Sequence, residues 1–369
     1  MPTKEKIKVL TITTSGLEKK EGISTVILDY YRKLDKKKYE LHIIASGKYD
    51  RELVEDFKKA GVIVKRIPSR KEDFLAYCKA LLRLLKKEKY DTCYLHGSSA
   101  LMTFELLMVT LFGCKNRVVH SHNTTCNHKI IDKVLRPLFY RLITVKLACG
   151  KDAGKWLYGK NKFYIINNGR EPEEYKFDSQ VREKMRGLLG LKGDCIAMGH
   201  VGNFTDQKNQ LFLVELFKMI HDENSNTKLF LIGDGPRRME VEQLACRCGL
   251  ENSVIFTGSV RNVPDYLQAM DVMVLPSLHE GLPLVVVEWQ MSGLPSVISS
   301  NVTKECAFSD LVSFIGLDAP KSEWISCIMN NKDNDREVES KKAIQKARVK
   351  GFDINRGIVI LDKALSRRV

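Results

Sequence analysis

Short apolar runs alternate with longer amphipathic segments along the first half of the chain. The runs have the length and the β-branched composition of strands, and residues 70–88 repeat leucines on one face of a helix. Strands that alternate with helices predict a parallel sheet with helices on both faces. The predicted strands of this half lie at residues 7–12, 39–44, 62–67, 92–96, 116–120, 145–149 and 162–166.

The alternation stops at residues 171–190, a charged segment without a strand pattern that is typical of a connector. It then starts again, with predicted strands at 196–202, 228–233, 253–258, 271–277 and 294–299. We therefore predict an α/β protein with two Rossmann-like domains. Their expected bounds are 1–173 and 174–350, followed by a C-terminal helical segment, 351–369, that is expected to return to the first domain.

The distribution of charge distinguishes the two halves of the chain. Residues 1–173 carry 35 Lys and Arg against 19 Asp and Glu, a net charge of +16, whereas the remainder has a net charge of −1. Such asymmetry indicates an anionic partner for the first domain, either nucleic acid or an anionic membrane surface. Solvated faces on lysine-rich helices are the alternative explanation.

The location expected from the sequence is the cytoplasm. The chain has no apolar stretch of about 18 residues without charges, and its start lacks the pattern of a signal peptide. Its ten cysteines lie mostly in apolar segments, which is typical of buried thiols in a reducing compartment. Cys246 and Cys248 do not have the paired spacing of a zinc site.

Ligands of open α/β sheets bind beyond the carboxyl ends of the strands, so the cleft between the two domains is the expected active site. In the first half, Gly22 opens a predicted helix, where free backbone N–H groups favour an anion. His96 follows the fourth strand, and His120, His122 and Asn123 follow the fifth. Metal binding is one explanation of the histidines. Without a carboxylate or cysteine set, contact with a sugar or a phosphate donor is the favoured one.

In the second half, Gly202 and Asn203 follow the first strand, and Lys208 comes at the start of the next helix. A glycine followed by a lysine suits a diphosphate. Gly233 begins a Gly-Asp-Gly-Pro turn after the second strand, which is a weak phosphate signal.

The segment from Glu280 to Glu288 is the most informative of the chain. Its glycine and proline predict a tight turn into a helix whose free N–H groups could hold a phosphate; the turn residues are Gly281, Leu282 and Pro283. Glu288 lies in an apolar helix, where an unpaired carboxylate would be costly. Ribose hydroxyls are one candidate partner for it, and a buried ion pair is the alternative.

Five motifs occur in a specific order over residues 200–300: VGNFTDQKN, LIGDGP, VIFTG, DVMVLPSLHEGLPLVVVE and SGLPSVIS. In this order they resemble the retaining glycosyltransferase family 4, and the resemblance spans nearly the whole chain. It implies the GT-B fold, two Rossmann-like domains facing each other across a cleft. The QKN variant and Ser309-Asp310 resemble bacterial exopolysaccharide or capsule glycosyltransferases.

The resemblance also implies roles for individual residues. Glu280 would bind hydroxyls of the donor sugar, with the three residues after it contacting sugar and phosphate through their backbone. Glu288 would bind the ribose, and Lys208 would neutralise the diphosphate. The nucleotide base would lie near Arg261.

In the first domain, the resemblance implies that Gly22 covers the diphosphate and that His122 lies near the reacting sugar. His96, His120 and Asn123 are then acceptor-side candidates. Asn203 departs from the family, which commonly has arginine there. The expected catalytic residues are His122, Lys208 and Glu280.

The function expected from the sequence is transfer of a sugar from a nucleotide sugar, with UDP as the expected nucleotide, to a lipid-linked or saccharide acceptor. No metal or other cofactor is expected, since Asp333-Asn334-Asp335 lies in a polar stretch typical of a linker. Two alternatives remain open: a nucleotide-sugar hydrolase or epimerase of the same fold, and a non-catalytic protein that binds anionic surfaces. Nucleic acid is not expected as a partner, because it would leave the Glu280/Glu288 pair in the neutral half unexplained.

Overall fold

A computed structural model describes residues 5–14, 16–17, 22–47, 49–330 and 335–367. The chain divides into two compact units, residues 1–169 together with 354–369, and residues 170–353. The boundaries expected from the sequence lie between residues 173 and 174 and between residues 350 and 351. Within the described residues, no helix has the length and apolar character needed to cross a bilayer.

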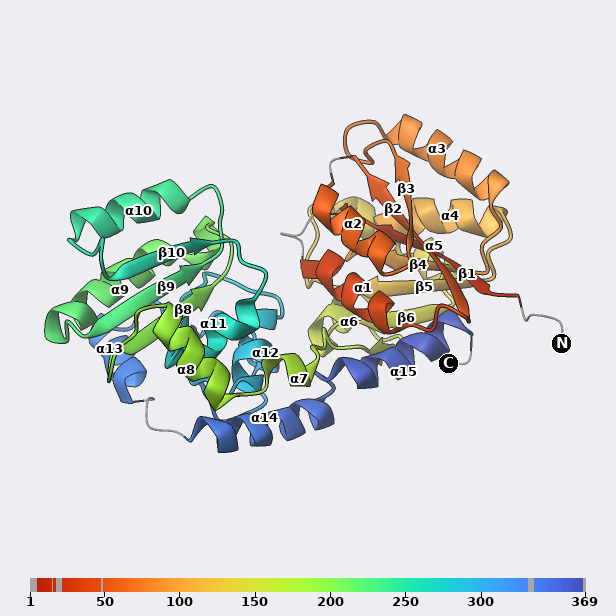
Figure 1. The fold of residues 1–369 in the computed structure, drawn as a ribbon. Coiled ribbons are helices and arrows are strands. Elements are labelled where there is room, and N and C mark those ends of the chain that lie inside the picture. Colours follow the sequence, from red (N-terminus) through yellow and green to blue (C-terminus); the bar gives the residue numbers. More distant parts are fainter. Residues whose placement is uncertain (1–4, 15, 18–21, 48, 331–334, 368–369) are drawn as a thin grey trace. The chain divides into compact units, whose positions relative to one another are not determined.

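The first unit is built on one parallel sheet of seven strands in the order β3-β2-β1-β4-β5-β6-β7 (Figure 1). Its strands are β1 (Ile7–Thr13), β2 (Tyr39–Ser46), β3 (Ile63–Ile67), β4 (Thr92–His96), β5 (Asn116–Ser121), β6 (Val145–Ala148) and β7 (Tyr164–Ile165). Its helices are α1 (Gly22–Lys33), α2 (Arg51–Lys59), α3 (Phe74–Lys87), α4 (Thr103–Leu111), α5 (Lys129–Leu142), α6 (Lys151–Tyr158) and α15 (Ile354–Leu365).

Helix α15 belongs to this unit although it is the last element of the chain. Asn116 donates hydrogen bonds to the carbonyls of Ala364 and Leu365, and Thr92 donates to the second of these. At its other end, Gly357 packs so tightly on Tyr30 that a Cβ there would lie 2.2 Å from the phenol oxygen. These contacts tie the C-terminal helix to strands β4 and β5 and to helix α1.

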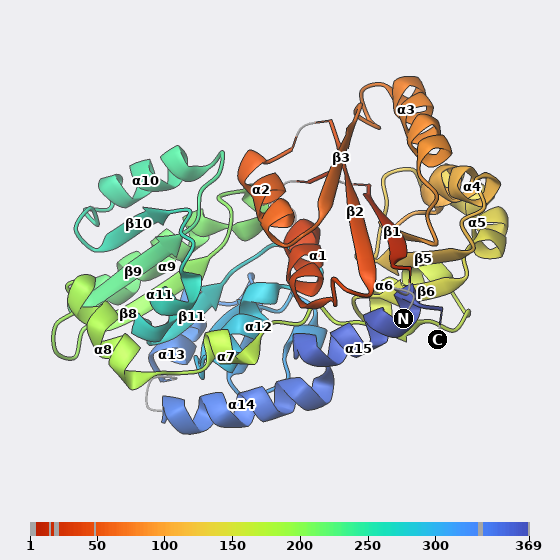
Figure 2. The same ribbon diagram turned by 45° about the vertical axis from the view of Figure 1, so that its right-hand side comes forward.

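The second unit has a parallel sheet of six strands in the order β10-β9-β8-β11-β12-β13 (Figure 2). Its strands are β8 (Ile196–Val201), β9 (Thr227–Ile232), β10 (Val254–Gly258), β11 (Val272–Leu275), β12 (Ser296–Ser299) and β13 (Val312–Ile315). Its helices are α7 (Pro172–Tyr175), α8 (Ser179–Leu188), α9 (Gln210–Glu223), α10 (Arg238–Arg247), α11 (Val263–Ala269), α12 (Leu284–Met291), α13 (Lys321–Asn330) and α14 (Arg336–Lys350).

Each face of the second sheet has its own apolar core. One core holds Trp324 and Phe217, from helices α13 and α9, and the other holds Trp289 and Ala347, from α12 and α14. Strands covered on both faces explain the unbroken apolar runs of the sequence.

The structure differs from the predicted elements in two places. The predicted connector forms helices α7 and α8, and Asp178 caps α8 by accepting hydrogen bonds from two backbone N–H groups. Strand β13 was not predicted. Its four residues, Val-Ser-Phe-Ile, are a short run interrupted by one serine at the edge of the sheet, which is a weak pattern.

Candidate active site

Lys208 and Glu280 meet at the point in the second sheet where the strand order reverses. The chain runs from β8 outward to β10 and then returns to β11 on the other side of β8. Lys208 follows β8, and Glu280 follows β11. The Lys208 Nζ lies 2.6 Å from the Glu280 Oε1, and both side chains are largely buried. Ligands of such sheets bind at this position, beyond the carboxyl ends of the strands.

Hydrogen bonds join the segments that carry these two residues. The Leu278 N–H donates to the Gln207 carbonyl, and the Gln207 side-chain amide donates to the His279 carbonyl. Asn209 has a left-handed backbone, with φ of 55°, and its side chain donates to the Pro276 carbonyl. Asparagine tolerates this conformation better than most residues. The QKN sequence therefore has a structural role, because Gln207 and Asn209 hold the two segments together. Ser277, whose hydroxyl donates a hydrogen bond to Glu280, was not predicted as a residue of the site.

Gly202 and Gly233, both predicted to bind donor phosphate, have close-packed backbones. A Cβ on Gly202 would lie 3.1 Å from the Lys208 Cε. Gly233 has a φ of 139°, and a Cβ there would lie 2.1 Å from the Gly202 carbonyl oxygen. Glycine is therefore needed at 233 to let the loops after β8 and β9 approach each other. Contact with phosphate at either glycine remains a prediction.

Replacing Gly233 with alanine is expected to destabilise the second unit by about 3 kcal/mol or more, because a strained backbone adds to a steric clash. Gly187 in helix α8 is the matched control, since a Cβ there meets no atom within 4 Å. The Gly187→Ala variant should be as stable as the wild type or slightly more so. Denaturant unfolding measures both, and equal midpoints for the two variants would contradict the prediction.

The turn that was predicted before the next helix is present. Pro283 is the N-terminal capping residue of α12, and no side chain of the described residues caps the helix there. Gly281 is exposed, Leu282 is half-buried, and Glu280 forms a parallel β-bridge with Val302. Helix α12 begins four residues after Glu280, so its first N–H groups follow the glutamate of the Lys208–Glu280 pair closely along the chain, as a phosphate site would require.

Glu288 takes part in a buried ion pair, the alternative that the sequence left open. Its Oε1 accepts a hydrogen bond of 2.6 Å from the Arg170 Nε, and both side chains are largely buried. Arg170 directly follows an Asn-Asn-Gly turn, and nothing in the sequence pattern links it to α12. A ribose contact through Glu288 remains a prediction. The ion pair with Arg170 gives Glu288 a structural role as well.

Two further donor-binding candidates lie in loops of the same unit. Asn203, found where arginine is common, is exposed, and its carbonyl accepts a hydrogen bond from Gln210. Arg261 is exposed in the turn between β10 and α11. Both loops follow strand ends, as the predictions require, but no contact in the structure identifies a ligand for either residue.

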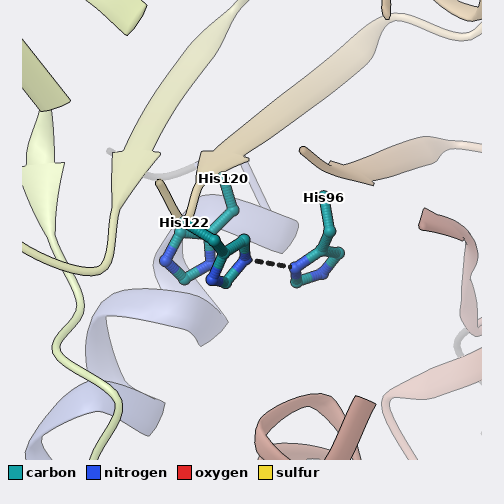
Figure 3. A group of neighbouring side chains, drawn as sticks. All are labelled: His96, His120 and His122. Carbon is teal, nitrogen blue, oxygen red and sulfur yellow. Dashed lines mark hydrogen bonds between the residues drawn. The ribbon is translucent and has the colours of Figure 1, made fainter. Parts of the chain in front are cut away.

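The three histidines predicted in the first unit form one buried cluster, His96, His120 and His122 (Figure 3). His96 and His120 are paired neighbours in the β4–β5 register, and His122 follows two residues later. The His96 Nδ1 lies 2.8 Å from the His122 Nε2. The Tyr94 hydroxyl lies 2.7 Å from the His120 Nδ1. His96, the last residue of β4, is also paired with Thr13 of β1, and the strand order of this sheet reverses between β1 and β4.

Burial lowers the pKa of all three histidines, that of His122 to about 3. An unfolded histidine takes up a proton near pH 6.5, whereas the folded cluster stays neutral. The unfolded state therefore binds more protons below pH 6.5, and stability is lost as the pH falls toward 3. Below pH 6.5, His122→Asn should reduce the slope of the free energy of unfolding against pH by about 1 kcal/mol per pH unit. Unfolding at pH 7.5, 6.5 and 5.5 measures the slope, with exposed His128→Asn as the control; equal slopes in all three proteins would contradict the prediction.

The remaining candidates of the first unit are not part of this cluster. Asn123 is exposed just beyond it. Gly22 is the exposed first residue of α1, and a Cβ there would meet no atom of the described residues within 4 Å. Their predicted contacts with acceptor and diphosphate stay predictions.

Two groups within the described ranges have the spacing of metal ligands: the histidine cluster, and Glu40 with His42 and Glu88. In the second group the carboxylates pair with Lys8 and Lys65. In the histidine cluster, the hydrogen bond between His96 and His122 already occupies one nitrogen of each of these two rings. Asp333 and Asn334 lie outside the described residues. The absence of a metal cofactor remains a prediction.

Comparison with known proteins agrees with this arrangement. The family model described as Glycosyltransferase Family 4 matches residues 20–174, and the model described as Glycosyl transferases group 1 matches residues 196–312. EpsF of Bacillus subtilis strain 168, a protein named as a glycosyltransferase, is 31% identical over 322 residues, or 83% of each chain. An Escherichia coli UDP-Gal:alpha-D-GlcNAc-diphosphoundecaprenol alpha-1,3-galactosyltransferase is 29% identical over 62% of each chain.

The fold also matches solved structures. Anabaena HepE, crystallised with UDP and glucose, superposes with a TM-score of 0.77 over 98% of this chain and 100% of its own, at 18% identity. That likeness supports the GT-B fold expected from the sequence. The two family-model matches and the similarity to EpsF over most of both chains show that this chain is a glycosyltransferase and belongs to glycosyltransferase family 4.

Proposed function

We propose that this glycosyltransferase moves a sugar from a UDP-sugar to a lipid-linked glycan of bacterial polysaccharide synthesis, with retention of configuration and without a metal. The observation that carries the donor half is the Lys208–Glu280 pair, whose glutamate precedes the N-terminus of α12 by four residues. The UDP in the HepE structure and in the name of the E. coli relative supports the choice of nucleotide. The diphosphoundecaprenol in that name supports the acceptor.

In this proposal Lys208 and the α12 N–H groups stabilise the charge that develops on the departing diphosphate. Such preorganised electrostatic stabilisation is usually the largest catalytic contribution. Glu280 accepts hydrogen bonds from hydroxyls of the donor sugar. When the diphosphate binds, Lys208 is shared between it and Glu280, so the ion pair holds the lysine in place beforehand.

The test of this proposal is a thermal-shift screen against UDP-, GDP-, ADP- and dTDP-sugars, because a ligand that binds only the folded state raises its stability. The selected donor is then incubated with and without a polyprenyl-diphosphate-linked sugar. Acceptor-dependent release of UDP, unchanged by EDTA, and a product with the donor's anomeric configuration are expected. UDP release that is independent of the acceptor, or an epimerised donor, would favour the hydrolase or epimerase alternative.

The membrane contact that the charge asymmetry predicted has a candidate surface on α5. Its exposed apolar residues recur on one side of the helix, with exposed fractions of 82% for Ile130, 71% for Val134 and 40% for Leu138. Exposed Lys129 and Lys133 lie among them. A helix with an apolar face flanked by basic side chains suits the interface of an anionic bilayer.

The Ile130→Glu/Val134→Glu variant is expected to bind anionic vesicles at least about tenfold more weakly, because it removes apolar area and adds repulsion. Leu188→Glu is the matched control, since Leu188 is 71% exposed on α8 of the other unit. Vesicle co-sedimentation at physiological salt measures binding. Equal binding by the double variant and the wild type would place the contact elsewhere or exclude it.

A further inference from the structure

The hydrogen bond between His96 and His122 contains one proton. Its two nitrogens, His96 Nδ1 and His122 Nε2, lie 2.8 Å apart, so one must donate and the other accept. Both rings are buried, and their other nitrogens, His96 Nε2 and His122 Nδ1, have no hydrogen-bond partner among the residues that the structure describes. Because a neutral imidazole carries one N–H, the proton state of one free nitrogen determines that of the other.

If the His96 Nδ1 donates, the His122 Nδ1 carries a proton and is a donor, and the His96 Nε2 is an acceptor. If the His122 Nε2 donates, both assignments reverse. The third ring does not enter this exchange, since the His120 Nδ1 pairs with the Tyr94 hydroxyl. The His122 ring lies against His120, with ring centroids 4.3 Å apart and planes tilted by 34°, and the bond to His96 is the side-chain hydrogen bond among the described residues that holds the His122 ring at its rotation about the Cβ–Cγ bond.

We propose that His96 is a positioning residue, which orients the His122 ring and sets whether its free Nδ1 donates or accepts a hydrogen bond. This inference rests on the proposed function, in which His122 lies near the reacting sugar. In this role His96 acts through His122 and not directly on the substrate. Its effect reaches the reaction through the tautomer and the orientation of His122, as an orienting residue acts on the base in a catalytic triad.

Two substitutions separate this role from simple packing. His96→Leu fills the space but cannot bond to His122, and it should lower kcat about 10- to 100-fold with little change in the KM for the donor. His96→Asn keeps an amide near the position of the Nδ1, and it should restore most of that loss. Tyr94→Phe is the matched control, because it removes the bond to His120 alone and should leave kcat within about twofold of the wild type.

Imidazole ¹⁵N spectra of the full-length protein supply a readout that does not depend on activity. His122 should show one neutral tautomer in the wild type and in His96→Asn, and a changed or mixed tautomer in His96→Leu. An unchanged His122 tautomer in His96→Leu, or an Asn variant as slow as the Leu variant, would overturn the proposal. If the wild type transferred no sugar, the proposed function would fail, and these spectra would still test the positioning of His122.

Discussion

Replacing Lys208 with alanine is expected to lower kcat for sugar transfer about a thousandfold. Loss of one preorganised donor to a developing anion typically costs 10²–10³ in rate. Lys208 is a full charge in a partly buried position, where water screens it weakly. The substitution also leaves Glu280 without its cation, so the carboxylate would repel the diphosphate.

Lys321 offers a matched control in the same unit. It forms a Lys–Glu pair with Glu215 at the same distance of 2.6 Å, but both side chains are far more exposed. Lys321→Ala should therefore leave turnover unchanged. The Lys208→Ala/Glu280→Gln double variant isolates the loss of the lysine from repulsion by the carboxylate. Turnover of Lys208→Ala within threefold of the wild type would exclude the proposed role.

Replacing Glu288 with alanine is expected to lower the free energy of unfolding by about 3–5 kcal/mol, because it breaks the buried ion pair with Arg170. For a domain of this size the melting temperature should fall by about 10 °C. The exposed pair of Arg348 and Glu173 is the control, and Glu173→Ala should cost less than about 1 kcal/mol.

A double variant distinguishes the structural role of Glu288 from its predicted ribose contact. Arg170→Met/Glu288→Leu removes both charges and should recover most of the stability, since an apolar pair often replaces a buried ion pair at little cost. If Glu288 also binds ribose, the recovered protein should show a KM for the donor at least tenfold above that of the wild type. Recovered stability with an unchanged KM would leave Glu288 with the structural role alone.

Most of the fold could be predicted from local pattern. Parallel strands that are buried on both faces form continuous apolar runs, and these located all strands of the two sheets except the edge strand β13. Gly202, Gly233, Lys208 and Glu280 were singled out as candidates because they follow predicted strands. The sequence did not predict why residue 233 must be glycine. The carbonyl oxygen that excludes a Cβ there belongs to Gly202, in the loop after another strand.

The sequence by itself determined the fold class, the family and the strand ends at which the candidate residues lie, because these depend on periodicity and on motifs within short segments. Only the tertiary structure decided which strand ends are neighbours. It placed Lys208 against Glu280, Arg170 against Glu288, and His96 against His122. Strand order and register bring such residues together across long sequence separations, and no local pattern of side chains encodes them.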